Sequence, residues 1–406
     1  MTPEKIVVVG LNGGGLDPER KRLIAGASLV VGGERHLAAA GVEGERSVAL
    51  KGDLSGAMER IPEVDGRVVV LASGDPGFFG IVRLLSGRFG SERLEVLPAP
   101  SSVALAFGRA GMSWEDAVVV SVHGVESERG PRRAVNVCRA HPKVCVLTRP
   151  GFGPGEIASE LQHLGLRFAV GERLGMEGER VFFGDAEEVL SETWREPNVV
   201  IVYDRNRLPE GKSWLSGGAP GSGAWGLSLD EFEYRSAMIT RPEPRSVVLS
   251  KLGPGVGDLI WDVGAGSGSV AVECARFGAA AIAVERDRES CGNVRKNAAR
   301  HGLRVEVVEG EAPAALHGLP DPDAVFIGGT GGDFEGVVEF CAGRAIRSVV
   351  LTLITLERVV PAMRLLERFG CRVEAVQHQT SHVRPIAKMH RLVPESQVFI
   401  VSGTKG

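Results

Sequence analysis

Leu259-Ile-Trp-Asp-Val-Gly-Ala-Gly-Ser-Gly268 is an apolar run that leads directly into three alternating glycines. A buried strand that ends in a tight glycine turn is how a Rossmann-like domain begins the site for an adenosine-containing cofactor. Further along, residues 280–284 form a second apolar run, which ends at the carboxylate of Glu285. The order of strand, glycine turn and acidic strand end predicts a Rossmann-like α/β domain in this half of the chain.

The glycine spacing indicates which cofactor the turn binds. Nicotinamide sites favour G-x-G-x-x-G, in which a pyrophosphate lies on a helix N-terminus. Gly264, Gly266 and Gly268 instead give G-x-G-x-G, which suits S-adenosylmethionine because that cofactor has no phosphate. We expect Glu285 to accept hydrogen bonds from both ribose hydroxyls. A turn without a ligand and a nicotinamide dehydrogenase are the alternatives at this point.

The size and charge of the chain narrow the class of protein. Its 406 residues suggest two or three domains. The formal net charge is -4 and 5% of the residues are aromatic, so we expect neither a basic field nor a stacking platform for nucleic acid. No apolar run approaches ~18 residues, the length that a membrane-spanning helix needs. The sequence therefore predicts a protein without nucleic-acid or membrane partners.

The cysteines and the first residues predict a cytoplasmic protein. Six cysteines are scattered, none of them forms C-x-x-C, and no histidine pair has metal-binding spacing. We expect buried free thiols in a reducing compartment and no metal site. Glu4 and Lys5 precede the short apolar run 6–9, which predicts a first strand rather than a signal peptide.

Apolar runs divide the chain into two α/β halves joined by a linker. In the first half we expect strands at residues 6–9, 29–31, 68–72, 118–122, 144–148 and 199–203, with helices at 101–110 and 155–164. Residues 206–226 are rich in Gly, Pro and Ser, which predicts a linker between a domain at 1–205 and a domain at 227–406. A long surface loop of a single domain is the alternative.

The second half restarts with a helix at residues 241–251. Five strands are expected at 258–263, 280–284, 305–308, 324–327 and 348–352. The last two strands, 371–377 and 397–402, have no long helix between them. This ending predicts an antiparallel pair that closes the sheet, as is typical of S-adenosylmethionine-dependent methyltransferases.

Two segments of the second half supply candidate site residues. Gly310-Glu-Ala-Pro313 follows a strand where an adenine ring is expected, so Glu311 or the backbone of Ala312 is a candidate contact. A helix N-cap is the alternative. The strand within Pro322-Asp-Ala-Val-Phe-Ile-Gly-Gly-Thr-Gly-Gly332 ends in bare backbone. The segment leaves room for a large flat substrate beside Gly328, Gly329 and Thr330.

Charged residues give weaker signals. Near the C-terminus a short span holds six basic residues, namely His378, His382, Arg384, Lys388, His390 and Arg391. Such a cluster could grip a polycarboxylate through charge-assisted hydrogen bonds, with Arg384 and Arg391 as the candidate substrate contacts. A solvated loop is the alternative. Glu233 is a candidate general acid or base, and a surface carboxylate is its alternative reading.

Several segments together resemble the carbon-15 methyltransferase/decarboxylase family of cobalamin biosynthesis. The resemblance covers residues 226–406 and is carried by Gly226-Leu-Ser-Leu-Asp-Glu-Phe-Glu233, Met238-Ile-Thr-Arg241, the glycine turn and Ala324-Val-Phe-Ile-Gly-Gly-Thr-Gly-Gly332. In that family the matching segments touch S-adenosylmethionine. The resemblance therefore implies cofactor contacts at Thr240, Gly264, Ala265, Gly266, Ser267, Gly268, Glu285 and Ala312.

The first half resembles the tetrapyrrole methyltransferase family over residues 5–204. Three motifs carry the resemblance, namely Val9-Gly-Leu-Asn-Gly-Gly-Gly15, Ser73-Gly-Asp-Pro-Gly77 and Pro98-Ala-Pro-Ser-Ser102. The segment Ala27-Ser-Leu-Val-Val-Gly-Gly-Glu-Arg-His-Leu37 is similar to the carbon-5 methyltransferases of the same pathway. The first loop departs from the family pattern G-x-G-P-G because Asn12 replaces a glycine and the proline is absent. The implied cofactor contacts are Gly10, Gly14, Gly74, Asp75, Pro76, Ser102 and His123.

Fused in this order, the two resemblances imply an N-terminal tetrapyrrole-methylase fold followed by a C-terminal Rossmann-like methyltransferase fold. They also imply a self-associating enzyme that methylates carbons 5 and 15 of a precorrin and removes carbon dioxide from the ring C acetate. The alternatives are a methyltransferase acting on RNA or protein, and a tetrapyrrole-binding scaffold or S-adenosylmethionine sensor with one degenerate domain.

Overall fold

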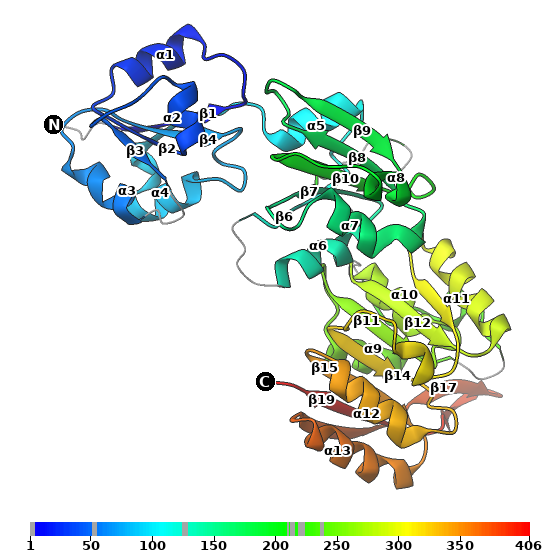
Figure 1. Ribbon diagram of the computed structural model, residues 1–406. Coiled ribbons are helices and arrows are strands. Elements are labelled where there is room, and N and C mark those ends of the chain that lie inside the picture. The colour runs from blue at the N-terminus through cyan, green and yellow to red at the C-terminus, as the bar shows by residue number, and fades with distance from the viewer. Residues whose placement is uncertain are drawn as a thin grey trace. The chain divides into compact units, whose positions relative to one another are not determined.

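The computed structural model describes residues 5–50, 55–123, 129–208, 211, 216–217, 224–235 and 239–406. The chain divides into two compact units (Figure 1). The first contains Met1–Glu115, Val119–Val125 and Cys145–Val202, and the second contains Asp116–Val118, Glu126–Val144 and Tyr203–Gly406. Much of the predicted linker and Met238 of the quoted motif lie outside the described residues, so the predicted domain boundaries stay a prediction.

One sheet of the first unit is parallel and buried on both faces. Its order is β3 (Ser47–Ala49), β2 (Leu29–Gly32), β4 (Val68–Ser73), β1 (Ile6–Leu11) and β5 (Leu94–Leu97). Alternate residues of β1 enter different cores, with Val8 on one face and Val9 on the other. Continuous apolar strands of this kind are typical of parallel sheets that helices cover on both sides. The helices α1, α2, α3 and α4 span Pro18–Ala25, Glu34–Ala39, Ser55–Arg60 and Val82–Phe89.

The second sheet is mixed. Its order is β6 (Val118–Ser121), β7 (Lys143–Leu147), β10 (Asn198–Tyr203), β8 (Arg167–Glu172) and β9 (Arg180–Gly184), with β8 and β9 antiparallel. Helices α5, α7 and α8 span Ser102–Ala110, Pro154–Leu161 and Ala186–Leu190. All six strands expected in the first half are present. The sequence did not predict β3, β5 and β9, because short or half-exposed strands lack a clear apolar run. It also did not predict β8, which is buried but has the short apolar stretch Phe168-Ala-Val170 before Gly171 and Glu172.

The second unit contains a seven-stranded sheet in the order β13 (Glu306–Glu309), β12 (Ala280–Glu285), β11 (Leu259–Val263), β14 (Ala324–Ile327), β15 (Ser348–Leu353), β19 (Val398–Thr404) and β16 (Arg372–His378). The first five strands are parallel, and β19 runs antiparallel to both of its neighbours. The expected antiparallel closure is therefore confirmed. A separate hairpin, β17 (Ser381–Ile386) with β18 (Met389–Pro394), lies between β16 and β19 in the chain and was not predicted.

Helices cover both faces of this sheet. Trp261 of β11 is fully buried in a core that also holds residues of α12 (Phe334–Arg344) and α13 (Val359–Arg368). Its neighbour Ile260 faces the opposite core, against α9 (Pro242–Leu252) and α10 (Ser269–Arg276). Helix α11 (Arg288–Arg300) packs Val294 against alanines of β12. Because five strands are parallel, the turns that follow them all lie at the carboxyl ends of the strands, on one side of the domain.

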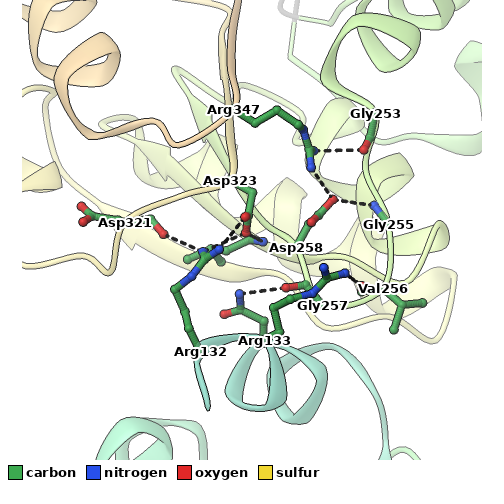
Figure 2. A network of polar contacts seen from close by, with 12 residues as sticks. Arg132, Arg133, Gly253, Gly255, Val256, Gly257, Asp258, Asp321, Asp323 and Arg347 are labelled. Atoms are coloured by element: carbon green, nitrogen blue, oxygen red, sulfur yellow. Dashed lines mark hydrogen bonds and ion pairs between the residues drawn. The ribbon is translucent and has the colours of Figure 1, made fainter. Parts of the chain in front are cut away.

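Helix α6 (Arg129–Ala140) belongs with the second unit although the sequence places it in the first half. Arg132 donates to Asp323, and Arg133 donates to the carbonyl of Val256 (Figure 2). Asn136, 2% exposed, donates to the carbonyl of Gly257. Asp258 and Asp323 immediately precede β11 and β14. Helix α6 is therefore bound near the N-terminal ends of β11 and β14, whereas the glycine turn follows the C-terminal end of β11.

Other expectations drawn from composition can be compared with the structure. All six cysteines are buried and free, as predicted. Among the described residues, no helix is long and apolar enough to cross a membrane. The same part of the chain contains no group of three or more His, Cys, Asp or Glu side chains that could hold a metal ion.

Candidate active site

The glycine turn after β11 has a backbone that only glycine adopts easily. Gly264, Gly266 and Gly268 have φ angles of +68°, +55° and +69°. A Cβ added to Gly264 would lie 2.5 Å from the carbonyl oxygen of Gly329. Side chains rarely adopt positive φ, so the turn requires glycine for both conformation and space. This close approach brings the ends of β11 and β14 together.

Glu285 lies beside this turn, as the sequence predicts. One carboxylate oxygen accepts the N–H of Gly266 at 2.9 Å, and the other accepts the N–H of Asp287 at 2.9 Å. Each carboxylate oxygen has a second lone pair, so the group can still accept hydrogen bonds from two hydroxyls. The backbone therefore holds Glu285 in position for the expected ribose contact.

A second carboxylate, Asp262, lies beneath the turn and was not among the predicted site residues. It is 1% exposed, and one of its oxygens accepts the N–H of Ala271 at 2.9 Å. Burial raises the pKa of Asp262 to about 7, the hydrogen bond from Ala271 opposes the shift, and the nearby charge of Glu285 adds to it. Its position within the turn motif was the signal that could have identified it.

A cavity of about 900 Å³ opens above the turn. This volume is near the upper end of the range for small-molecule sites, ~300–1,000 Å³. Of the predicted cofactor and substrate residues, those that line it are Thr240, Gly264, Ala265, Gly266, Glu285, Glu311, Ala312, Gly328, Gly329 and Thr330. Ser267 and Gly268 are not lining residues, because Ser267 is buried and Gly268 caps α10. Residues far apart in the sequence thus meet in one cavity.

Two buried features shape the cavity wall near Thr240 and Thr330. The Thr330 hydroxyl is buried and has no hydrogen-bond partner within the described chain. Arg245 and Glu273 form a fully buried ion pair at 2.7 Å. Arg245 also donates to the carbonyl of Thr240 at 2.5 Å, while Glu273 accepts the N–H of Leu227 at 2.9 Å. This pair holds the Thr240 segment in place and was not predicted, because its two residues lie 28 positions apart in the chain.

The C-terminal basic cluster divides between sites. His378 lines the main cavity, whereas His382 and Arg384 line an adjoining cavity of about 390 Å³. Arg391 lies opposite Arg384 in the β17–β18 register but lines neither cavity. The structure therefore brings Arg384 to the site and does not bring Arg391 there.

Glu395 joins the two cavities and was not predicted. Its Oε1 atom lies 2.9 Å from Nη1 of Arg241 and 3.1 Å from Nε2 of His382. Both Arg241 and Glu395 line both cavities. Arg241 directly follows the predicted Thr240, which is the one signal that could have drawn attention to it.

Glu233 lies outside both sets of lining residues. Its side chain is 56% exposed and forms a 3.0 Å ion pair with Lys296. Its backbone N–H donates to Asn297 at 2.7 Å. The structure gives Glu233 no contact with the cavity, and a catalytic role for it stays a prediction.

In the first unit, the predicted loops converge at the ends of β1, β4 and β5. A Cβ on Gly10 would lie 2.1 Å from the carbonyl oxygen of Gly74 and 2.6 Å from the amide nitrogen of Ala99. Gly74 has a φ of +57°. The Cδ of Pro76 would be 3.2 Å from the same Cβ. Gly10, Gly74 and Pro76 therefore form one backbone cradle, and their contact with a cofactor stays a prediction.

The remaining predicted residues of the first unit have simple local roles. Asp75 accepts the N–H of Gly77 at 2.8 Å, and Asn12 accepts the N–H of Gly14 at 3.3 Å. The Asn12 side chain thus forms a hydrogen bond within the first loop, where the family pattern has a glycine. Ser102 is the first residue of α5, and His123 is exposed just after β6. Their roles in cofactor binding stay predictions.

A small polar cluster beside this cradle was missed. The Ser73 hydroxyl accepts from Arg35 at 2.8 Å and lies 3.0 Å from Nε2 of His36. Burial, followed by the charge of Arg35, lowers the pKa of His36 to about 4. His36 is therefore neutral near pH 7. Arg35 and His36 both belong to the segment Ala27–Leu37, which is similar to the carbon-5 methyltransferases.

The second-unit cavity fits S-adenosylmethionine by its chemistry. Gly264 leaves space that a side chain would fill, Glu285 presents free lone pairs, and the buried hydroxyl of Thr330 lacks a partner. These features match a ligand with a ribose diol and a polar tail. Gly264 and Gly266 of the turn, Glu285, Thr240 and Ala312 are the lining residues placed to hold the cofactor, and this assignment stays a prediction.

Two family models match successive parts of the chain. Residues 6–190 match the family model of tetrapyrrole (corrin/porphyrin) methylases, and residues 230–405 match a precorrin methyltransferase domain. The chain is 37% identical to precorrin-6Y C(5,15)-methyltransferase (decarboxylating) of Sinorhizobium sp, a comparison that covers 99% of this chain and 96% of the relative.

Two separate proteins of Salmonella typhimurium strain LT2 each match a part of the chain. Its cobalt-precorrin-7 C(5)-methyltransferase is 33% identical over 49% of this chain and 98% of its own length. Its cobalt-precorrin-6B C(15)-methyltransferase (decarboxylating) is 32% identical over 41% of this chain and 89% of its own length. Two proteins that are separate in that organism are thus each similar to a part of this one chain.

Proposed function

The chain belongs to the family of precorrin-6Y C(5,15)-methyltransferases (decarboxylating), and from this premise we propose that it methylates carbons 5 and 15 of precorrin-6Y, or of its cobalt analogue, with S-adenosylmethionine as the donor. We propose further that the second unit removes carbon dioxide from the ring C acetate. The products are intermediates of cobalamin biosynthesis.

The observation that carries the proposal is the cavity of the second unit. It combines the glycine turn and Glu285 on one wall with the glycine-rich end of β14 at Gly328 and Gly329. Its volume of about 900 Å³ lies near the upper end of the range for small-molecule sites, ~300–1,000 Å³. A large second ligand can therefore approach the same floor of bare backbone.

The first unit supports a second, independent donor site. A Cβ on Gly10 would lie 2.1 Å from the carbonyl oxygen of Gly74, and a Cβ on Gly74, whose φ is +57°, would lie 3.1 Å from Cα of Ser101. A backbone cradle at the ends of parallel strands is where ligands bind in open α/β sheets. We assign methylation at carbon 5 to this unit and methylation at carbon 15 to the other.

The residues act chiefly by position. When bound, S-adenosylmethionine supplies a methyl group on a positively charged sulfur, which is an excellent leaving group. Glu285 and the turn at Gly264 orient that donor, and holding two reactants in line accounts for much of the acceleration. The conjugated macrocycle itself accepts the electron pair that decarboxylation releases. Because the sulfonium leaves readily, no covalent nucleophile is required, and shielding the bound reactants from water assists the transfer.

We also propose that the enzyme is cytoplasmic and self-associating and does not act on nucleic acid. The six buried free thiols suit a reducing compartment. The net charge of -4 gives no basic field for nucleic acid. Sedimentation of the purified protein would measure its association state.

Incubation with precorrin-6Y or its cobalt analogue and S-adenosylmethionine tests the function, with product mass as the readout. Two methyl gains and the loss of one carbon dioxide are expected. A gain at carbon 15 alone would indicate a first unit that serves only as a scaffold. No change with either substrate, but methylation of RNA or protein, would overturn the proposal.

A further inference from the structure

The main cavity has two chemically different halves. Beside the glycine turn it is lined by Glu285, Glu311 and Arg286, with Arg286 in a 3.0 Å ion pair with Glu311. At the other side of the sheet, next to β15, β19 and β16, the cavity is lined by Arg358, His378 and Glu395, with Arg241 paired to Glu395. Two carboxylates outweigh one guanidinium on the first side, and two guanidiniums outweigh one carboxylate on the second. The cofactor residues occupy the first half, so the positive half faces the other ligand.

Arg358 is the cation of this half that lacks a carboxylate. Arg241 is already paired with Glu395 at 2.9 Å. Among the described residues, Arg358 forms no ion pair, and its guanidinium lies 5.2 Å from the ring centre of Phe334. A guanidinium with open donors at a cavity wall is well suited to a carboxylate, which it can bind with two parallel hydrogen bonds.

The segment that carries Arg358 also offers apolar surface. Ile354, which lines the cavity, is 78% exposed, and Leu356 is 62% exposed. Large apolar side chains left open beside a cavity mark a binding surface. Apolar contact next to a guanidinium fits a flat macrocycle with an apolar face and acidic side chains at its rim.

The adjoining cavity supplies a second cation position. It is lined by Arg241, Arg384, His382 and Glu395. The carboxylate of Glu395 already forms an ion pair with Arg241 and a hydrogen bond with His382, and these contacts hold both side chains in place. Arg384 has no ion pair among the residues that the structure describes, and therefore keeps its donors available.

We propose that Arg358 and Arg384 bind two peripheral carboxylates of the tetrapyrrole while Ile354 packs against its ring, so that this surface sets the specificity of the carbon-15 site. The Glu395 carboxylate positions Arg241 and His382 between them. This inference rests on the proposed function, because it names the residues that hold that substrate. Methyl esters of the substrate, which lack the negative charges, should bind poorly at this surface.

The test uses the full chain with Arg358→Gln and Arg384→Gln. Arg364→Gln is the matched control, because Arg364 lies on α13, is exposed and lines neither cavity. A charge-assisted hydrogen bond is replaced by a neutral one, so each variant should weaken substrate binding roughly ten- to hundredfold. The dissociation constant for S-adenosylmethionine and methylation at carbon 5 should not change, and Arg358→Lys should restore part of the affinity.

Two readouts separate the outcomes. Absorbance titration with precorrin-6Y, without the methyl donor, measures substrate binding, and product mass measures turnover. If both variants bind precorrin-6Y as tightly as Arg364→Gln does, the inference is wrong even when the parent enzyme is active. If the parent binds precorrin-6Y in an Arg358-dependent way but transfers no methyl group, the proposed function fails and the binding surface stands.

Discussion

Arg132 of helix α6 donates hydrogen bonds from both terminal guanidinium nitrogens to the two carboxylate oxygens of Asp323, at 2.9 and 2.6 Å (Figure 2). Asp323 also accepts the N–H of Leu259, the first residue of β11, at 2.8 Å. One carboxylate thus connects a helix from the first half of the sequence to the strand that leads into the glycine turn.

Arg132→Ala should destabilise the second unit. Asp323 would keep its charge, with a side chain 10% exposed, and lose two charge-assisted hydrogen bonds. We expect the free energy of unfolding to fall by about 1.5–3 kcal/mol, measured by denaturant titration. Arg129→Ala on the same helix is exposed and should change it by less than about 0.5 kcal/mol. Equal effects of the two variants would show that the Arg132 contact contributes nothing specific.

Gly264→Ala should abolish cofactor binding in the second unit. The new Cβ would lie 2.5 Å from the carbonyl oxygen of Gly329, and the φ of +68° disfavours alanine. Calorimetric titration with S-adenosylmethionine should detect one site fewer than in the parent. Gly292→Ala in α11, where a Cβ meets open space, should leave both sites intact. Retention of full binding by Gly264→Ala would contradict the assignment.

Glu285→Gln should weaken cofactor binding in the second unit by roughly tenfold to a hundredfold, because two hydrogen bonds to a charged group become hydrogen bonds to a neutral one. Methylation at carbon 5 should continue. Glu309→Gln is the matched control, since Glu309 lies beside Glu285 in the β12–β13 register but outside the cavity. Should both methylations fail equally in a folded Glu285→Gln protein, the two-site assignment is wrong.

Gly10→Ala should impair the first unit and spare the second. Its Cβ would lie 2.1 Å from the carbonyl oxygen of Gly74, so the cradle of the first unit cannot keep its shape. We expect loss of methylation at carbon 5, with methylation and decarboxylation by the second unit retained, as read from product mass. Gly87→Ala, in open space on α4, is the control. Loss of both methylations in a folded Gly10→Ala protein would argue for a single shared site.

Asp262 should make the stability of the second unit depend on pH. Its folded pKa is raised to about 7 from an ordinary 3.8, so between these values the folded state holds a proton that the unfolded chain has released. The free energy of unfolding contributed by this group therefore falls as pH rises from about 4 to about 7. Asp262→Asn cannot ionise, and the difference between variant and parent should change across that window. A constant difference would contradict the raised pKa.

Much of the fold could be predicted because its signals are local. The apolar runs of β1, β4 and β12 are continuous, as is typical of buried parallel strands. Exposed strands, such as β17 and β18, have no comparable run and were missed. A hairpin with almost every residue exposed has no buried face whose pattern would distinguish it from a loop.

By itself, the sequence determined the backbone chemistry of both cradles. Gly10, Gly74 and Gly264 specify close backbone approach, and Glu285 ends its strand. These features belong to short motifs, so they could be predicted from neighbouring residues alone. Only the tertiary structure decided which side chains meet around them. Arg358 and Glu395 reach the cavity, and α6 reaches Asp323, through contacts between residues that are remote in the chain. Local patterns encode strands and turns, whereas ion pairs and cavity walls depend on how those elements pack.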